Sequence, residues 1–271
     1  MELNNKVIII TGASSGIGKA LAYELAGRGA NLVLGARQYV TLCDITNDIQ
    51  KQFNTKALAV QCDVSVEEDC AFLIKQAILT FGKIDVLINN AGISMRALFN
   101  DLDLKVLKSL MDVNFWGTVY CTKYALPEII KTKGSVVGVS SIAGYKGLPG
   151  RTGYSASKFA MNGFLDALRV ENLKTGVHVM TACPGFTASN IRNTALNKSA
   201  QQQGESSLNE EKMMTAEEVA KIIANGIVKR ERTLIMTGQG KLTVTLSKLL
   251  PALLDKLVYN VFAKEKDPLL K

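Results

Sequence analysis

The stretch KVIIITGASSGIGK, residues 6–19, decides the fold that we expect for this chain. Residues 6–11 are mostly β-branched, which is typical of a strand buried on both faces of a parallel sheet. Glycine-rich sequence follows directly, and an apolar helical pattern continues from residue 19 to about residue 28. A strand, a glycine loop and a helix in this order place a helix N-terminus where a phosphate can bind.

The glycine loop has the spacing Gly-x-x-x-Gly-x-Gly, which differs from the commoner Gly-x-Gly-x-x-Gly pattern. Because a strand precedes it and a helix follows it, we interpret it as a nucleotide-binding loop rather than a plain tight turn. The residues expected to contact the nucleotide are Gly12, Ser14, Ser15, Gly16, Ile17 and Gly18.

The end of the second predicted strand, residues 31–35, indicates which nucleotide is bound. In this architecture an acidic residue there binds the adenosine ribose hydroxyls, whereas an arginine accommodates a 2′-phosphate. The chain has Ala36 and Arg37 at this point and no acid. This pattern favours NADP over NAD, and the alternative is that Arg37 only caps the strand in solvent.

Further predicted strands at residues 56–61, 84–88, 135–140, 178–183 and 233–236 alternate with helical segments. The alternation predicts an α/β fold: a Rossmann-like, doubly wound, parallel seven-stranded sheet with helices on both faces. No linker or internal repeat interrupts it, so we expect a single domain over residues 1–271. The polar stretch 186–214 is long enough to be a substrate loop.

Two turns at strand ends are expected beside the cofactor. Asp63, after the third strand, could accept a hydrogen bond from the adenine amino group or cap the next helix, at 67–81. Asn90, Ala91 and Gly92 follow the fourth strand, and small residues there let a flat cofactor approach the backbone.

Tyr154 and Lys158 are the candidate chemical pair. At i and i+4 of a predicted helix they share one face. An ammonium about 4 Å from the phenol would lower the tyrosine pKa by roughly three units, toward the range of a useful general acid or base. Ser140 ends the predicted strand before this helix, and Ser141 follows it. Asn114 lies inside a predicted long helix, either as a local kink with a polar task or as a harmless, partly exposed position.

Composition excludes several other classes of protein. The net charge of +8 suits an anionic partner, but no nucleic-acid-binding motif is present. The five scattered cysteines are expected to be reduced core thiols of a cytoplasmic protein. His178 is the one histidine, so a histidine metal site is excluded, and we interpret His178 as structural. We see no signal peptide or membrane anchor before residue 6.

The C-terminal extension, residues 241–271, carries an apolar helical stripe flanked by lysines. Charges interrupt it too often for it to span a bilayer. Packing over the substrate cleft or against another subunit is the ordinary interpretation. Peripheral contact with a membrane surface through residues 241–263 is the alternative.

The ordered set of motifs resembles the short-chain dehydrogenase/reductase family in its single-domain form. The motifs are the glycine loop, the Asn89–Gly92 turn, Asn114, Ser141, Tyr154-x-x-x-Lys158 and Pro184-Gly185. The sequences around Ser141 and Tyr154 are similar to the hydroxysteroid-dehydrogenase-like branch. The lysine-flanked tail is similar to that of proteins called dehydrogenase/reductase member 7.

The resemblance implies a role for each matching residue. Tyr154 would be the general acid/base, Lys158 would lower its pKa and hold the nicotinamide ribose, and Ser141 would bind the substrate oxygen. Asn114 would hold a water in a proton relay. Either Thr187 or Ser189 would reach the nicotinamide carboxamide. The other implied cofactor contacts are Val64, Pro184 and Gly185.

These observations predict an NADP(H)-dependent oxidoreductase that interconverts a carbonyl and a secondary alcohol. The apolar residues Ile142, Leu148 and Phe186 suggest a bulky lipid-like or steroid-like small-molecule substrate. The resemblance suggests a homodimer or homotetramer. The alternative is a non-catalytic NADP-binding sensor or scaffold on the same fold.

Overall fold

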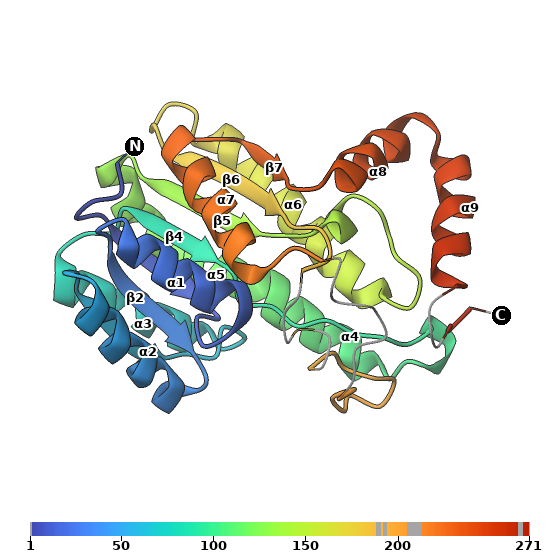
Figure 1. Cartoon of the computed structure of the whole chain (residues 1–271), viewed down its shortest axis with the longest axis horizontal. Coiled ribbons are helices and arrows are strands. Elements are labelled where there is room, and N and C mark those ends of the chain that lie inside the picture. Colours follow the sequence, from blue (N-terminus) through green and yellow to red (C-terminus); the bar gives the residue numbers. More distant parts are fainter. Residues whose placement is uncertain (1, 188–190, 192–193, 205–212, 265–267, 271) are drawn as a thin grey trace.

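Seven parallel strands form the sheet at the centre of the molecule, in the order β3-β2-β1-β4-β5-β6-β7 (Figure 1). This seven-stranded parallel sheet confirms the predicted fold class. The computed structural model describes residues 2–187, 191, 194–204, 213–264 and 268–270. The strands are β1 (Val7–Thr11), β2 (Asn31–Ala36), β3 (Ala57–Gln61), β4 (Val86–Asn89), β5 (Ser135–Val139), β6 (His178–Cys183) and β7 (Thr233–Ile235).

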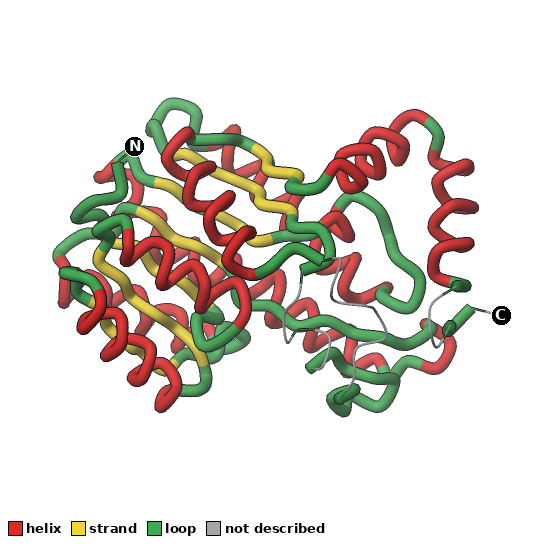
Figure 2. Tube along the Cα trace, in the orientation of Figure 1, coloured by secondary structure: helices red, strands yellow, loops and turns green. Residues whose placement is uncertain are grey.

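Helices cover both faces of this sheet (Figure 2). Alternate residues of β1 point to opposite faces, with Ile8 and Ile10 in one core and Ile9 in the other. Burial on both faces explains why the strands read as continuous apolar runs. One face carries α1 (Gly16–Gly27), α2 (Tyr39–Gln52) and α7 (Ala216–Lys229), and the other carries α3 (Glu67–Phe81), α5 (Gly117–Thr132) and α6 (Thr152–Glu171).

The strand order reverses at β1, which pairs with β2 on one side and β4 on the other. In such sheets, ligands bind at the carboxyl ends of the strands beside this switch point. Here Thr11 Oγ1 accepts hydrogen bonds from the Asn90 and Ala91 N–H groups, at 3.1 and 3.0 Å. These bonds join the loops after β1 and β4 into one edge of the crevice.

The predicted long helix around Asn114 is interrupted. It consists of α4 (Leu104–Leu110), a π-helical segment (Met111–Trp116) and α5. The Asn114 side chain is fully buried, and its amide bonds lie outside its own helix. Single π-helical turns often occur at functional sites. Of the two alternatives for Asn114, the harmless, partly exposed position is therefore wrong, and its polar task stays a prediction.

The amino ends of the parallel strands lie together on one side of the sheet, which we call its amino edge. Buried polar groups at this edge form hydrogen bonds and ion pairs with neighbouring residues. Asp85 accepts hydrogen bonds from Lys6 Nζ at 3.0 Å and the Val7 N–H at 2.9 Å, and it pairs with Lys83 at 2.8 Å. His178 Nδ1 lies 3.0 Å from Ser135 Oγ, and His178 Nε2 lies 2.8 Å from the Glu231 carbonyl oxygen. Because His178 links strand ends far from the crevice, its structural interpretation is confirmed.

The C-terminal stripe forms two helices, α8 (Gly238–Leu249) and α9 (Pro251–Phe262), which stand apart from the sheet (Figure 1). The sequence predicts one continuous stripe, but Pro251 lacks an N–H group and cannot continue α8. A Cβ at Gly240 would lie 2.7 Å from Ile142 Cδ1, and Lys146 pairs with Asp255. We call these two helices the C-terminal arm. The contacts dock it beside residues 140–144, the turn after β5 that we call the Ser141 turn.

Among the described helices, none combines the length and the apolar character that crossing a bilayer would need.

Candidate active site

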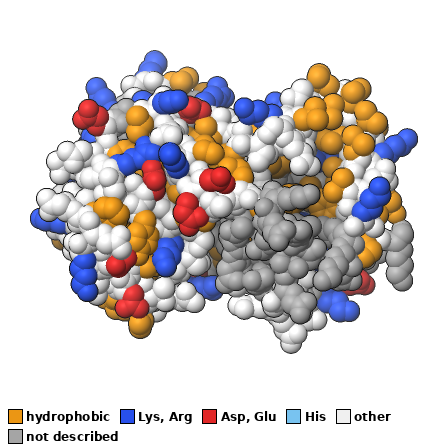
Figure 3. Space-filling view, in the orientation of Figure 1, with side chains coloured by type: hydrophobic (Ala, Val, Ile, Leu, Met, Phe, Trp, Pro, Cys, Tyr) orange, Lys and Arg blue, Asp and Glu red, His pale blue; other side chains and the backbone are white. Residues whose placement is uncertain are grey.

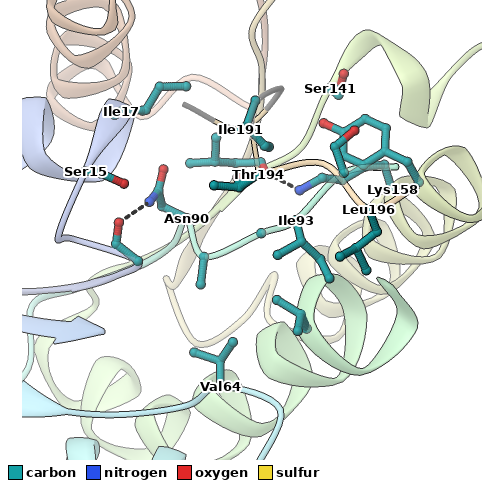
Figure 4. Close-up of a pocket in the computed structure, with 18 of the residues that line it drawn as sticks. Ser15, Ile17, Val64, Asn90, Ile93, Ser141, Lys158, Ile191, Thr194 and Leu196 are labelled. Atoms are coloured by element: carbon teal, nitrogen blue, oxygen red, sulfur yellow. Dashed lines mark hydrogen bonds between the residues drawn. The ribbon is translucent and has the colours of Figure 1, made fainter. Parts of the chain in front are cut away.

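A cavity of about 700 Å³ opens at the carboxyl ends of the central strands (Figure 4). It runs from Ala36 and Arg37, at the carboxyl end of β2, to Tyr154 on α6. Of the predicted catalytic and cofactor-binding residues that the structure describes, Gly18 and Asn114 are the two outside the lining. The predicted residues in the lining are Gly12, Ser14, Ser15, Gly16, Ile17, Arg37, Asp63, Val64, Asn90, Ala91, Gly92, Ser141, Tyr154, Lys158, Pro184, Gly185 and Thr187.

The glycine loop is shaped for a phosphate. Gly12 has a φ of +65°, a backbone conformation that residues with a side chain rarely adopt. Helix α1 begins at Gly16, inside the glycine loop, rather than at residue 19 as the sequence pattern predicts. The first turn of α1 has no acidic residue and no side-chain capping bond. Its N–H groups are therefore available to an anion.

Gly18 contributes by close packing and not by lining the cavity. A Cβ there would lie 2.2 Å from the Gly12 carbonyl oxygen and 2.5 Å from Asn90 Nδ2. Asn90 Nδ2 in turn donates to the Thr11 and Gly12 carbonyl oxygens, at 2.9 and 3.2 Å. The third glycine thus lets α1 approach the loops that form the crevice edge.

The adenosine end of the cavity is more open. Arg37 is exposed there, and no acid lies beside it at the end of β2. Asp63 Oδ1 accepts from the N–H and the hydroxyl of Ser65, at 3.0 and 2.7 Å. Helix α3 has Val66 as its N-cap, without a side-chain capping bond, so the capping alternative for Asp63 is wrong.

Tyr154, Lys158 and Ser141 line the other end of the cavity. Figure 4 labels Lys158 and Ser141 there. The Lys158 ammonium lies 5.8 Å from the Tyr154 ring centre and donates to the Val139 carbonyl oxygen at 2.8 Å. Ser141 begins a one-turn 3-10 helix, Ile142–Gly144, and its Oγ accepts from the Ala143 N–H at 3.1 Å. The Ser141 side chain is close enough to Tyr154 to influence the pKa of the phenol.

The pKa of Tyr154 moves opposite to the expectation from spacing. Burial raises it above its ordinary value, and the Ser141 hydrogen bond and the Arg151 charge only partly oppose this effect. Lys158 is itself buried, and burial lowers its pKa to about 8. The phenol therefore keeps its proton at neutral pH, so without a ligand it is equipped to act as an acid.

Asn114 supports the site from behind the cavity wall. Its Oδ1 accepts from the Ile93 N–H at 2.8 Å, and its Nδ2 donates to the Ile93 carbonyl oxygen at 3.0 Å and to Ser157 Oγ at 2.9 Å. Ser157 Oγ donates to the Tyr154 carbonyl oxygen at 2.8 Å. Asn114 thus connects the loop after β4 with the helix that carries Tyr154.

The segment after β6 is described in part. Thr187 is buried in the cavity wall, and its Oγ1 donates to the Gly185 carbonyl oxygen at 3.2 Å. Ser189, and much of the predicted substrate loop 186–214, lie outside the described residues. Leu148 and Phe186 line the cavity, but Ile142 does not, because it packs under Gly240 of the C-terminal arm.

Several lining residues were not predicted from the sequence. Ile93 and Ser94 directly follow the Asn89–Gly92 turn, and this adjacency could have identified them. Arg151 is 8% exposed and is the N-cap residue of α6, three residues before Tyr154. Leu196 joins the wall through its N–H bond to the Ser94 carbonyl oxygen at 2.9 Å, a long-range pairing that no local pattern indicates.

The cavity fits a dinucleotide in shape and chemistry. It combines an uncapped helix N-terminus, an exposed arginine at one end and small residues along the floor. A Cβ at Gly92 would lie 3.1 Å from Asn114 Oδ1 and 3.6 Å from Lys158 Nζ, so a larger residue there would crowd both groups. Within the described ranges, no group of His, Cys, Asp or Glu side chains is arranged to hold a metal ion.

Comparison with known proteins agrees with this geometry. The family model of short chain dehydrogenases matches residues 6–200. The chain is 38% identical over 254 residues to 11-beta-hydroxysteroid dehydrogenase-like 4A of Arabidopsis thaliana, an alignment covering 93% of this chain and 83% of that protein.

Two solved structures share the fold. A short chain dehydrogenase/reductase from Burkholderia phymatum in complex with NAD has a TM-score of 0.82 and 22% identity, covering 93% of this chain and 96% of that one. An alcohol dehydrogenase from the archaeon Thermococcus sibiricus, complexed with 5-hydroxy-NADP, has a TM-score of 0.73 and 24% identity, covering 85% and 94%.

The resemblance to the hydroxysteroid-dehydrogenase-like branch is confirmed by the relatives, whereas the similarity of the tail to dehydrogenase/reductase member 7 stays a prediction. With its fold, its nucleotide-shaped cavity and a family match over most of its length, this chain belongs to the short-chain dehydrogenase family of nicotinamide-dependent oxidoreductases.

Proposed function

We propose that this protein is an NADP(H)-dependent oxidoreductase that interconverts a carbonyl and a secondary alcohol. The observation that carries the proposal is a single cavity. It joins the glycine loop and Arg37 at one end to Ser141, Tyr154 and Lys158 at the other. A cofactor held by the first group would extend toward the second, which is where a substrate oxygen would need a proton.

Each residue then has a defined task. The bound cofactor supplies or accepts the hydride. Tyr154 Oη transfers the proton at the substrate oxygen, and Ser141 Oγ donates a hydrogen bond to the same oxygen. Lys158 holds the nicotinamide ribose, and its charge favours the phenolate once proton transfer begins. Asn114 keeps a relay water behind the pair, and Thr187 binds the carboxamide.

The preference for NADP rests on Arg37. It is exposed at the adenosine end, where an acid would have selected an unphosphorylated ribose. Guanidinium groups bind phosphate through fixed, bidentate hydrogen bonds. Asp63 lies farther along the same wall and would accept a hydrogen bond from the adenine amino group.

The proposed substrate is a bulky, mostly apolar ketone or alcohol. The cavity wall beside Tyr154 includes Ile93, Leu148, Phe186 and Leu196. The Arabidopsis relatives are named for hydroxysteroids, which agrees with a large lipid-like substrate. The test is NADPH oxidation over a panel of steroid ketones, aldehydes, quinones and 3-ketoacyl compounds, repeated with NADH.

The alternative function is a non-catalytic NADP-binding sensor or scaffold. Tight NADPH binding without turnover of any panel member, in either direction, would favour it over catalysis. The presence of Ser141, Tyr154 and Lys158 together at the cavity end supports the enzyme.

Self-association through α5 and α6 is part of the proposal. Exposed apolar side chains lie on both helices, including Tyr124 and Ile130 on α5 and Phe159 on α6. Such a face is suited to a homodimer or homotetramer. Light scattering coupled to size-exclusion chromatography measures the oligomeric state, and a monomer at assay concentration would exclude the proposed self-association.

Peripheral membrane contact of a cytoplasmic protein is proposed for the C-terminal arm. Figure 3 shows apolar side chains gathered over it with basic residues at the margin. Leu249, Leu253 and Leu257 are 71%, 49% and 45% exposed. Such a face lies in a lipid interface when lysines flank it. We expect the protein to co-sediment with anionic vesicles and only weakly with neutral vesicles. The L249D/L253D variant should not co-sediment with anionic vesicles.

A further inference from the structure

Asn162 shares one face of α6 with the proposed catalytic pair. It follows Tyr154 by eight residues and Lys158 by four, so the three side chains project from successive turns. Asn162 is 8% exposed and lies outside the cavity lining. It cannot touch a substrate directly, and none of the sequence motifs includes it.

The Asn162 amide bridges the two ends of the Ser141 turn. Its Oδ1 accepts a hydrogen bond from Ser140 Oγ at 2.6 Å, and its Nδ2 donates to the Gly144 carbonyl oxygen at 2.9 Å. Ser140 directly precedes Ser141, and Gly144 ends the short helix that Ser141 begins. The amide therefore fixes the turn on both sides of the Ser141 hydroxyl.

Packing leaves this bridge little freedom. A Cβ at Gly144 would lie 2.6 Å from Asn162 Nδ2, 2.9 Å from Ser140 Oγ and 3.0 Å from the Lys158 carbonyl oxygen. The backbone of Ser140 is held as well, because its N–H donates to the Ala182 carbonyl oxygen at 2.7 Å. The side-chain bridge connects this strand end to α6.

We propose that Asn162 is a positioning residue that sets the place of the Ser141 hydroxyl relative to Tyr154. The inference rests on the proposed function, in which both hydroxyls address one substrate oxygen. Tyr154 is carried by α6 and Ser141 by the turn after β5, so their separation depends on what joins these elements. A misplacement of about 1 Å can cost roughly 100-fold in rate.

A purely structural role is the competing explanation, and the same helix offers a matched control. Asn172 at the C-cap of α6 is 5% exposed. Its Nδ2 donates to the Leu168 carbonyl oxygen at 2.9 Å, and its Oδ1 accepts from Thr175 Oγ1 at 3.1 Å. Asn172→Ala removes a buried amide of the same kind without touching the Ser141 turn.

The experiment compares N162A, S140A, N162A/S140A and N172A with the wild type. For each, kcat and KM are measured with the best carbonyl of the panel, NADPH affinity by fluorescence quenching, and Tm by scanning calorimetry. Assays are run at least 15 °C below the lowest Tm, so that loss of folded protein does not enter kcat.

We expect N162A to lower kcat by about 10- to 100-fold while the Kd for NADPH stays within about twofold. S140A should give a smaller loss, and the double variant should resemble N162A, because both substitutions break one shared bond. N172A should lower Tm to a similar extent yet keep kcat within about twofold.

Two outcomes overturn the inference in different ways. If N162A and N172A have the same kcat, Asn162 has no positioning role, and the proposed function is unaffected. If the wild type turns over no carbonyl, or Tyr154→Phe keeps full activity, the proposed function fails and the positioning role fails with it.

Discussion

The two edges of the sheet carry polar side chains for different purposes. At the amino edge, Asp85 and His178 are enclosed by partners from neighbouring strands and loops. At the carboxyl edge, Tyr154, Ser141 and Arg37 face a cavity of about 700 Å³. Both edges are built from loops that follow or precede the same strands, yet Asp85 and His178 face protein partners whereas the carboxyl-edge groups face a cavity.

This difference separates stability from chemistry. Polar groups enclosed by protein partners stabilise the fold, because leaving them unpaired would cost about 1–3 kcal/mol each. Groups that line a cavity contribute less to folding and are available to a ligand. Substitutions at the carboxyl edge should therefore change activity with little change in Tm, and substitutions at the amino edge should do the reverse.

The largest effect is expected for Tyr154→Phe. Removing the hydroxyl removes the proton donor, so kcat should fall by about 10²- to 10⁴-fold, while NADPH affinity stays within a few-fold. Steady-state kinetics and fluorescence titration measure the two quantities. Tyr23→Phe, which loses a hydroxyl bonded to Asp48 at 2.6 Å and lies outside the cavity lining, is the control. Full activity of Tyr154→Phe would exclude the mechanism.

Arg37→Asp should alter the choice of cofactor. The aspartate would repel a 2′-phosphate and accept hydrogen bonds from the ribose hydroxyls, so the NADPH/NADH ratio of kcat/KM should fall by about 10- to 100-fold. Lys51→Asp on α2 makes the same charge change outside the cavity lining. An unchanged ratio in Arg37→Asp, or an equal shift in Lys51→Asp, would contradict the assignment.

Asp85→Asn tests the amino edge of the sheet, where a substitution should lower stability and leave activity unchanged. The carboxylate accepts bonds from Lys6, Lys83 and the Val7 N–H, and the free energy of unfolding should fall by about 1–3 kcal/mol when the charge is removed. Thermal and urea unfolding measure this, and kcat should stay within twofold. A loss of activity in folded protein would show that the two edges are not independent.

The same variant gives a pH test. Burial alone would raise the pKa of Asp85, but hydrogen bonds from Lys83, Val7 and Lys6 lower it below its usual value. A lowered folded-state pKa contributes stability above the unfolded value of about 4, and acidification through the folded value removes it. The stability difference between wild type and Asp85→Asn should therefore shrink below about pH 4.

The smallest effect is expected from His178. Burial lowers its pKa, and the hydrogen bond to the Glu231 carbonyl opposes this only in part. The unfolded chain then binds the proton more readily than the folded one, so stability should decline as the pH falls below about 6.5. His178→Gln should show less decline between pH 7.5 and 5.5 by calorimetry. Equal slopes would mean that His178 does not titrate in this range.

Sequence reasoning was most successful where a local pattern carries the physics. The alternation of apolar strands with helices predicted the parallel sheet, and the glycine loop predicted the edge on which the cavity lies. Asn114 was recognised as an unusual helix residue, and it sits in a π-helical segment with its amide bonded outside the helix.

Reasoning from spacing failed where burial or a single proline outweighed it. The Tyr154–Lys158 spacing predicted a lowered tyrosine pKa, but desolvation dominates and raises it. The C-terminal stripe predicted one helix, but Pro251 divides it. Ile142 was expected at the substrate, but it packs against the C-terminal arm.

The sequence by itself determined the order of strands and helices along the chain, the glycine loop after β1 and the choice of Ser141, Tyr154 and Lys158 as candidate site residues. Periodicity, glycine placement and short motifs act over a few residues, so they can be read from one segment. Tertiary structure decided how Asn162 holds the Ser141 turn, how Leu196 joins the cavity wall and how strongly burial shifts each pKa. These depend on contacts between segments far apart in the chain and on the water that their packing excludes.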